Sequence, residues 1–185
     1  MKVLTTAKVV IDLEVQPKVL SGKRVTKGFR WIVDVVDDIN IQSLIESLPN
    51  VNVTAVSIGS IADESVLVKS IAMGGKEMIH FRCQNELIVR LDCLAKAKLL
   101  KNLILSRGFN LVAFGIQSSD INSAQLRLML AGLSNWLCVT DIKMIKQTSV
   151  KTFVVKCFVK NTLIEINVSF PCVLTCDLSV KTLEL

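Results

Sequence analysis

The sequence predicts an α/β protein of three layers: a doubly wound, mostly parallel sheet with helices on both faces, and antiparallel strands added in the C-terminal third. Short β-branched segments alternate with longer helical stretches through the first two thirds of the chain, a pattern typical of right-handed βαβ crossovers. The apolar run at 111–114 indicates a strand covered by helices on both sides. Segments at 139–145, 150–159 and 163–170 indicate the added antiparallel strands.

The first half of the chain begins with two strand–helix units. The predicted elements are strands at 3–10 and 51–58 and a helix at 34–48. A second helix opens at Ser60 and Asp63, which form an S-x-x-D capping box. It ends at Gly74, because glycine readily adopts the left-handed conformation that closes helices.

The second half repeats the alternation. The predicted elements are strands at 78–81 and 110–114, helices at 86–106 and 124–133, and a last strand at 172–176. On the helix 86–106 the residues expected to face the core are Leu87, Leu91, Leu94, Ala95 and Leu103. We expect all of these elements to form one domain, residues 1–185.

Composition excludes several classes of protein. Hydrophobic residues make up 51% of the 185 residues, but the apolar runs are far shorter than the about 20 residues of a membrane-spanning helix, so no membrane insertion is expected. The single histidine, His80, excludes any metal site with two histidine ligands. Six cysteines without a C-x-x-C pair indicate reduced thiols in an intracellular protein. The strand pattern starts at the first residues, so no signal peptide is expected.

The net charge of +6 is mild and is densest between residues 18 and 30. A nucleic-acid surface would also need aromatic or polar groups that read bases, and only Phe29 and Trp31 lie near. We therefore interpret this segment as a solvated hairpin or loop and expect no nucleic-acid partner.

The loop that follows the strand 110–114 is the best candidate for a ligand site. Ligands of open parallel sheets collect at the carboxyl ends of the strands, and here small and polar residues lie between a strand and a helix. Free N–H groups at a helix amino end favour an anion such as a phosphate. The alternative is structural: Asp120 or Ser123 caps the helix. Composition alone leaves both interpretations open.

Residues 115–136 resemble the nucleotide-binding signature of the β subunit of electron-transfer flavoproteins. The matching positions are Gly115, Gln117, Asp120, Gln125, Ala131, Gly132 and Trp136. Four further segments are similar to that family in the same order: the opening 1–12, V-S-I-G at 56–59, A-M-G-G at 72–75, and F-P-C-V-L-T-C-D-L at 170–178.

The resemblance implies a doubly wound, adenine-nucleotide-binding fold and a subunit that carries a structural AMP. It also implies an α-type partner that holds most of the FAD, so that the cofactor is shared in a heterodimer. In that family the dimer relays electrons from flavin dehydrogenases to a quinone reductase, in the mitochondrial matrix or, alternatively, in a bacterial cytoplasm. An electron carrier of this kind makes no bonds itself, so no catalytic residue and no metal ligand is expected in this chain.

The resemblance also implies which residues contact the cofactor. Gln125 and the backbone at 123–127 would meet the phosphate of AMP, and Thr6, Asp120 and Asn122 would meet its ribose or adenine. The full set is Thr6, Asp34, Ile58, Gly115, Gln117, Asp120, Asn122, Ser123, Ala124, Gln125, Leu126, Arg127 and Met129.

The sequence departs from the family pattern at four places. Asp34 and Val35 stand where the family has Asn-Pro, and Asn122 replaces a second acid. Arg127 stands where the family has glycine or proline; its guanidinium would either clamp the phosphate with two hydrogen bonds or fill the pocket. The family's C-terminal arm, which wraps the α subunit and presents the loop that dehydrogenases recognise, is expected to be absent after residue 178. Docking of dehydrogenases is then lost or replaced.

Two functions therefore remain open from the sequence. One is the β-like subunit of a heterodimeric electron-transfer flavoprotein. The other is a non-redox structural or binding paralogue that keeps the fold and the partner interface and has lost nucleotide binding.

The remaining notable residues have structural interpretations. His80 is expected to end its strand and to make a structural hydrogen bond. Cys172 and Cys176 share one face of a strand and are expected to be core residues and not a redox pair. Trp136 should pack where the helix 124–133 meets the added strands, and Trp31 is a candidate anchor for a partner.

Overall fold

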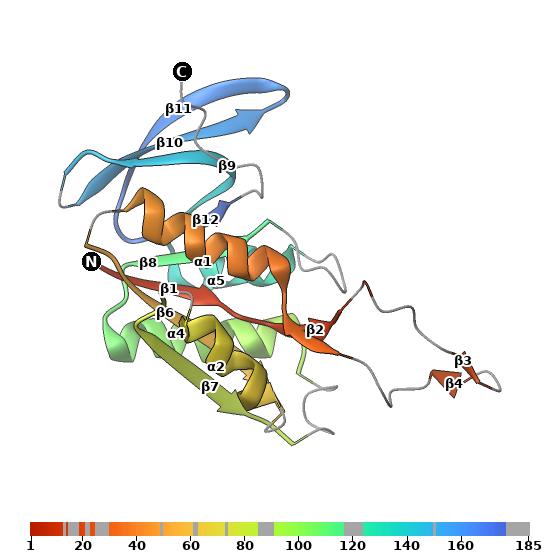
Figure 1. Cartoon of the computed structure of the whole chain (residues 1–185). Helices are drawn as coiled ribbons and strands as arrows, with labels where there is room; N and C mark the ends of the chain where they lie inside the picture. Colours follow the sequence, from red (N-terminus) through yellow and green to blue (C-terminus); the bar gives the residue numbers. More distant parts are fainter. Residues whose placement is uncertain are drawn as a thin grey trace.

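The computed structural model describes residues 1–12, 14, 19–20, 23–24, 30–48, 50–60, 63–72, 74–84, 91–116, 124–149 and 151–176. Its centre is an eight-stranded sheet in the order β11-β10-β9-β12-β8-β1-β6-β7 (Figure 1). The strands of this sheet are β1 (Lys2–Thr6), β6 (Asn52–Gly59), β7 (Glu77–Arg82), β8 (Leu111–Gly115), β9 (Leu137–Gln147), β10 (Thr152–Val159), β11 (Thr162–Ser169) and β12 (Cys172–Cys176). The helices are α1 (Val35–Ser47), α2 (Glu64–Ala72), α4 (Cys93–Arg107) and α5 (Gln125–Ser134).

The sheet is mostly parallel, as predicted. β1 runs parallel to both β6 and β8, β6 runs parallel to β7, and β8 runs parallel to β12. β10 is antiparallel to both β9 and β11, which confirms the added antiparallel strands. On its other side, β9 runs parallel to β12. The last described strand, β12, thus enters the middle of the sheet between β8 and β9, and all five of its residues are buried.

Helices cover both faces of the sheet, which confirms the three layers (Figure 1). Residues of α1 and α2, such as Leu44 and Leu67, join the core on one face. Residues of α4 and α5, such as Leu100 and Leu130, form the core on the other face. Trp136 packs against this second core beside α5, as predicted. None of the helices in the described ranges is both long and apolar enough to cross a bilayer.

The first predicted strand has different boundaries in the structure. The strand expected at 3–10 is two strands, because β1 ends at Thr6 and the chain continues into β2 (Val9–Ile11), which pairs with β5 (Trp31–Val33). The amide of Lys8, between them, donates to a side chain of α1 instead of a neighbouring strand. A second small pair is formed by β3 (Val19–Leu20) and β4 (Lys23–Arg24).

The long helix begins later than expected. α4 starts at Cys93, where the Asp92 side chain caps it by accepting from the amide of Ala95 at 2.7 Å. The predicted positions 86–90 lie outside the described residues. Leu103 faces the core as predicted, whereas Leu94 is exposed. The buried stripe of α4 instead follows Ala97, Leu100, Leu103 and Ile104.

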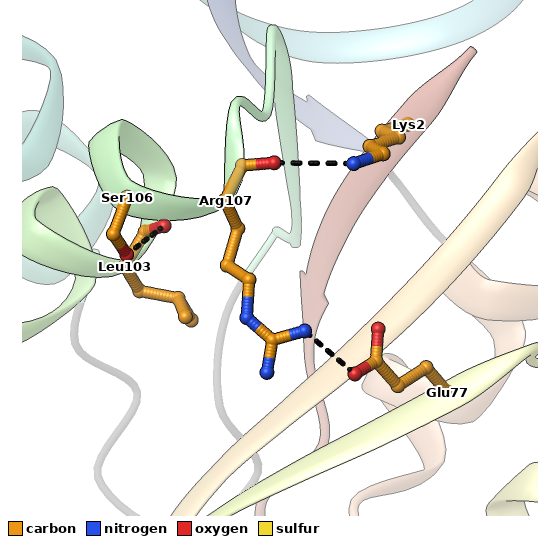
Figure 2. Close-up of polar contacts among 5 residues, drawn as sticks. All are labelled: Lys2, Glu77, Leu103, Ser106 and Arg107. Carbon is orange, nitrogen blue, oxygen red and sulfur yellow. Dashed lines mark hydrogen bonds and ion pairs between the residues drawn. The ribbon is translucent and has the colours of Figure 1, made fainter.

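The end of α4 is tied to the amino ends of two strands. Gly108 closes the helix in the left-handed conformation at φ 67°. Figure 2 shows the Lys2 ammonium donating to the carbonyl of Arg107 at 3.3 Å, and the Arg107 guanidinium paired with Glu77 at 3.0 Å. A cation at a helix carboxyl end is favourable, but pairs this exposed contribute at most about 1 kcal/mol each. They fix the carboxyl end of α4 at the edge of the sheet opposite to the strand carboxyl ends.

The prediction for His80 is wrong in two respects. The residue lies inside β7 and not at its end. Both of its ring nitrogens are buried without a hydrogen-bond partner among the described residues.

Candidate functional site

A cavity of about 420 Å³ lies at the carboxyl ends of the central strands. The strand order changes direction at β1, since the chain passes from β1 to β6 and β7 on one side and returns to β8 on the other. Ligands of doubly wound proteins bind at such a switch point. The described residues that line the cavity are Thr6, Ala7, Lys8, Asp37, Val56, Ser57, Ile58, Cys93, Lys96, Leu100, Phe114, Gly115, Ala124, Gln125, Leu126 and Arg127.

A buried carboxyl group is one of the polar groups in this cavity. Asp37, in the first turn of α1, is only 8% exposed. Its Oδ1 accepts from the Thr6 hydroxyl and its Oδ2 from the Lys8 amide, both at 2.8 Å. Burial raises the pKa of Asp37 to about 6, although these two hydrogen bonds and the Lys8 charge oppose the shift. A shifted carboxyl in a cleft is typical of functional sites.

The amino end of α5 borders the same cavity. At α1 and α4 the cap residues Asp34 and Asp92 accept hydrogen bonds from the first turn of the helix. The cap residue of α5 is Ala124, which makes no side-chain hydrogen bond. An acceptor on a ligand can therefore take the place that a capping side chain occupies elsewhere.

Basic side chains give the cavity a positive balance. Lys8, Lys96 and Arg127 line it together with the single described acid, Asp37. The guanidinium of Arg127 donates to the carbonyl of Ile116 and, at 3.5 Å, to that of Gly115. Its Nε is buried without a partner among the described residues, and burial lowers the pKa of Arg127. Arg127 thus borders the cavity and holds the start of the loop that follows β8, and the cavity persists beside it.

Gly115 allows α1 to approach β8. A Cβ atom at this position would overlap Cγ1 of Val36 and lie 3.3 Å from the Val36 carbonyl oxygen. Because Val36 precedes Asp37 in the first turn of α1, this close contact helps to place the buried carboxyl over the strand ends.

The structure brings together many of the residues predicted for the site. Those that line the cavity are Thr6, Ile58, Gly115, Ala124, Gln125, Leu126 and Arg127. Asp34 does not line it; it caps α1 by accepting from the Val36 amide. Met129 packs against the core between α4, α5 and the sheet. The predicted residues Gln117, Asp120, Asn122 and Ser123 lie outside the described residues.

Sequence reasoning missed several lining residues, above all Asp37, Lys96 and Cys93. The available signal was positional. When a helix follows a strand, a residue three positions after the helix cap lies near the strand end. Asp37 is three positions after the cap residue Asp34. For α4 the true start at Cys93 was needed before Lys96 could be placed in its first turn.

One other prediction is confirmed by the structure. Cys172 and Cys176 are buried in the core, and burial raises the pKa of each thiol to about 12. Trp31 is 46% exposed at the small β2–β5 pair, and its contact with a partner stays a prediction. In the described part of the chain no three His, Cys, Asp or Glu side chains gather in a way that could hold a metal ion.

The size and lining of the cavity are those of a small-molecule pocket. Its volume lies in the range of ligand pockets, about 300–1,000 Å³. It offers apolar walls from Val56, Leu100 and Phe114, and it borders the amino end of α5, which suits a phosphate. Acceptors at Asp37 and Thr6 suit the hydroxyl and amine groups of a nucleoside.

The fold and the cavity together define a doubly wound α/β protein with a cavity at its switch point. The family model described as "Electron transfer flavoprotein domain" matches residues 43–182. The chain belongs to the electron transfer flavoprotein family.

The similar curated proteins are β subunits of that family. The chain is 29% identical to "Probable electron transfer flavoprotein subunit beta" of Saccharomyces cerevisiae and 28% identical to "Electron transfer flavoprotein subunit beta" of Dictyostelium discoideum. Each of these alignments covers 98% of this chain and 72% of the relative. It is 29% identical to "Electron transfer flavoprotein subunit beta, mitochondrial" of Oryza sativa subsp. japonica, over 74% of this chain and 56% of that protein.

Proposed function

We propose that the chain is the β-type subunit of a heterodimeric electron-transfer flavoprotein. It binds AMP in the cavity at the carboxyl ends of β1, β6 and β8. It pairs with an α-type subunit that holds most of the FAD, and the pair relays electrons from flavin dehydrogenases to a quinone reductase. Because plant relatives are named as mitochondrial, we place this function in the mitochondrial matrix.

One observation carries the AMP part of this proposal. Seven residues that the family resemblance implies for AMP come from three separate parts of the chain, and they line a single cavity of about 420 Å³. Nothing in their sequence spacing requires this meeting, which depends on the strand order. The cavity also lies at the place where doubly wound folds bind nucleotides.

Different residues of the cavity would contact different parts of AMP. The amino end of α5, with Gln125 and the backbone at 124–127, would hold the phosphate, assisted by the charges of Lys96 and Arg127. The walls formed by Val56 and Phe114 would contact the base. AMP held in this way is a structural ligand that orders the strand ends and undergoes no reaction.

The redox chemistry of the pair belongs to FAD, which accepts and passes on electrons when it is bound. The role of this chain is to complete the flavin site of the α-type partner and to exclude water from it. No described residue of this chain is proposed to form or break a bond.

The contacts of Arg127 favour a second candidate function. Its guanidinium is hydrogen-bonded to two loop carbonyls where the family has a small residue or proline. A chain that uses this position to close its own loop would suit a structural or binding paralogue that keeps the α-type partner without AMP.

Release of the bound compounds tests the proposal. The chain is co-expressed with an α-type subunit from the same organism, and the purified complex is denatured and its supernatant examined by mass spectrometry. We expect AMP and FAD at about one equivalent each per heterodimer. A folded complex that releases neither compound contradicts electron transfer and supports the second candidate. AMP without FAD supports the nucleotide site alone.

A further inference from the structure

Asp37 makes one end of the cavity rich in acceptors. Its carboxyl lines the cavity and is held by the Thr6 hydroxyl and the Lys8 amide. Each carboxylate oxygen has two lone pairs, so each oxygen keeps one lone pair after these contacts. The Thr6 proton is used on Asp37, which leaves the Thr6 oxygen as an acceptor as well. A ligand group that lies here must donate a hydrogen bond.

The charged groups near Asp37, at one end of the cavity, differ from those at the α5 end. Asp34 on its own helix adds negative charge, and Lys8 at the end of β1 adds positive charge. On the elements across the cavity, Lys96 of α4 and Arg127 of α5 are the charged lining residues. A phosphate beside Asp37 would meet a carboxylate, whereas a phosphate at α5 would meet a helix amino end and Arg127.

We propose that Asp37 is a specificity-determining residue of this site: it accepts a hydrogen bond from a hydroxyl or amine of the nucleoside and thereby turns the phosphate toward α5. This inference rests on the proposed AMP site and adds the side chain that holds the nucleoside part of the ligand. It also adds a requirement for a hydrogen-bond donor on the nucleoside.

The proposal has a consequence for pH. A donor on the ligand is bound more strongly by the ionised carboxylate than by the protonated acid. Since the pKa of Asp37 is raised to about 6 by burial, ionisation of Asp37 should strengthen binding as the pH rises through 6. The phosphate of AMP also titrates near 6, so the comparison must be made against a variant that lacks the carboxylate.

The experiment is calorimetric titration of the full chain with AMP, 2′-deoxy-AMP, 3′-deoxy-AMP and inosine monophosphate. The proteins are wild type, Asp37→Asn and the control Asp38→Asn, whose half-buried carboxyl is next in sequence and does not line the cavity. We expect at least one analogue to bind wild type about tenfold or more weakly than AMP, the effect of losing a hydrogen bond to a charged group. That analogue identifies the donor as a ribose hydroxyl or as the adenine amine.

The variants give the second half of the test. In Asp37→Asn the preference for AMP over that analogue should fall several-fold. The ratio of the wild-type affinity for AMP to the Asp37→Asn affinity should rise between pH 5 and pH 7.5. Asp38→Asn should behave as wild type. Equal affinity of wild type for all four compounds would overturn the inference even if Asp37→Asn fails to fold, and so would a ratio that falls with pH. No binding of AMP to wild type would instead overturn the proposed AMP site.

Discussion

The Thr6 hydroxyl donates a 2.8 Å hydrogen bond to Oδ1 of Asp37, and this contact joins the end of β1 to the first turn of α1. Together with the Lys8 amide it holds a carboxyl group that is almost fully removed from solvent. The two hydrogen bonds favour the ionised form, yet burial outweighs them and the pKa of Asp37 is raised to about 6. The protein thus keeps an acid in its cavity at a cost in stability.

The first prediction concerns the pH dependence of this cost. The pKa of Asp37 is about 6 in the folded chain and 3.8 in the reference state, so its contribution to stability is fully present below pH 3.8 and is lost as the pH rises through 6. Asp37→Asn should therefore be more stable than wild type at pH 8, by at most about 3 kcal/mol. The gain should shrink between pH 6 and pH 4. Urea unfolding at these pH values measures it.

Asp38→Asn is the comparison for that measurement. The pKa of Asp38 is also raised by burial, but its side chain is only half-buried, so the same trend should be smaller. A stability difference between wild type and Asp37→Asn that does not change with pH would show that the Asp37 carboxyl titrates normally.

A second prediction compares two glycines. Gly115→Ala should destabilise the fold by roughly 1–3 kcal/mol, because the new Cβ would overlap Val36 and push α1 away from β8. Gly132→Ala is the matched control: a Cβ there meets nothing within 4 Å, and alanine in a helix is favoured by up to about 1 kcal/mol. Thermal unfolding should rank Gly132→Ala above wild type and Gly115→Ala below it. Equal losses in both variants would disagree with the close contact of α1.

The third prediction concerns Arg127. Arg127→Gln should weaken AMP binding by about tenfold, because it removes a charge from the cavity and the hydrogen bonds that hold the loop after β8. Lys101→Gln is a charge-matched control, since Lys101 bonds the carbonyl of Leu133 at the far end of α5. Tighter binding by Arg127→Gln would mean that the guanidinium occupies the space of the ligand.

A fourth prediction uses the cysteines as reporters. Iodoacetamide at pH 8 should leave Cys172 and Cys176 unmodified, because both are buried and their pKa values are raised to about 12. Cys93 and Cys83 are half-buried and should react. AMP at ten times its Kd should slow the reaction of Cys93, which lines the cavity, by about tenfold. Cys83 lies outside the cavity and should be unaffected; equal protection of both thiols would mean that AMP acts elsewhere.

The fold was predictable because its local signals agree with one another. The buried strand β8, the helix start after Asp34 and the order of strands and helices all followed from apolar runs and capping residues. The position of β12 could not be predicted in this way. β12 pairs with β8 on one side and β9 on the other, and this pairing is set by long-range packing that has no local signature. The start of α4 was misplaced because apolar spacing alone extends a helix past its cap at Asp92.

The site was predictable only where a motif marked it. Family resemblance marked Thr6, Ile58 and the start of α5, but Asp37 carries no motif and enters the cavity because α1 packs over the end of β1. Such a residue becomes visible only when the packing of helix on strand is known. That residues 1–185 form one domain stays a prediction.

Binding of AMP to the full chain tests the central claim most directly. The calorimetric titration compares wild type with Ala124→Phe, which fills the cavity at the amino end of α5, and with Leu128→Phe, which changes an exposed residue of the same helix outside the cavity. We predict one AMP per chain for wild type and Leu128→Phe, and at least about tenfold weaker binding for Ala124→Phe, since the added ring removes room for the phosphate. No binding to wild type, or equal binding to all three proteins, would contradict an adenylate site in this cavity.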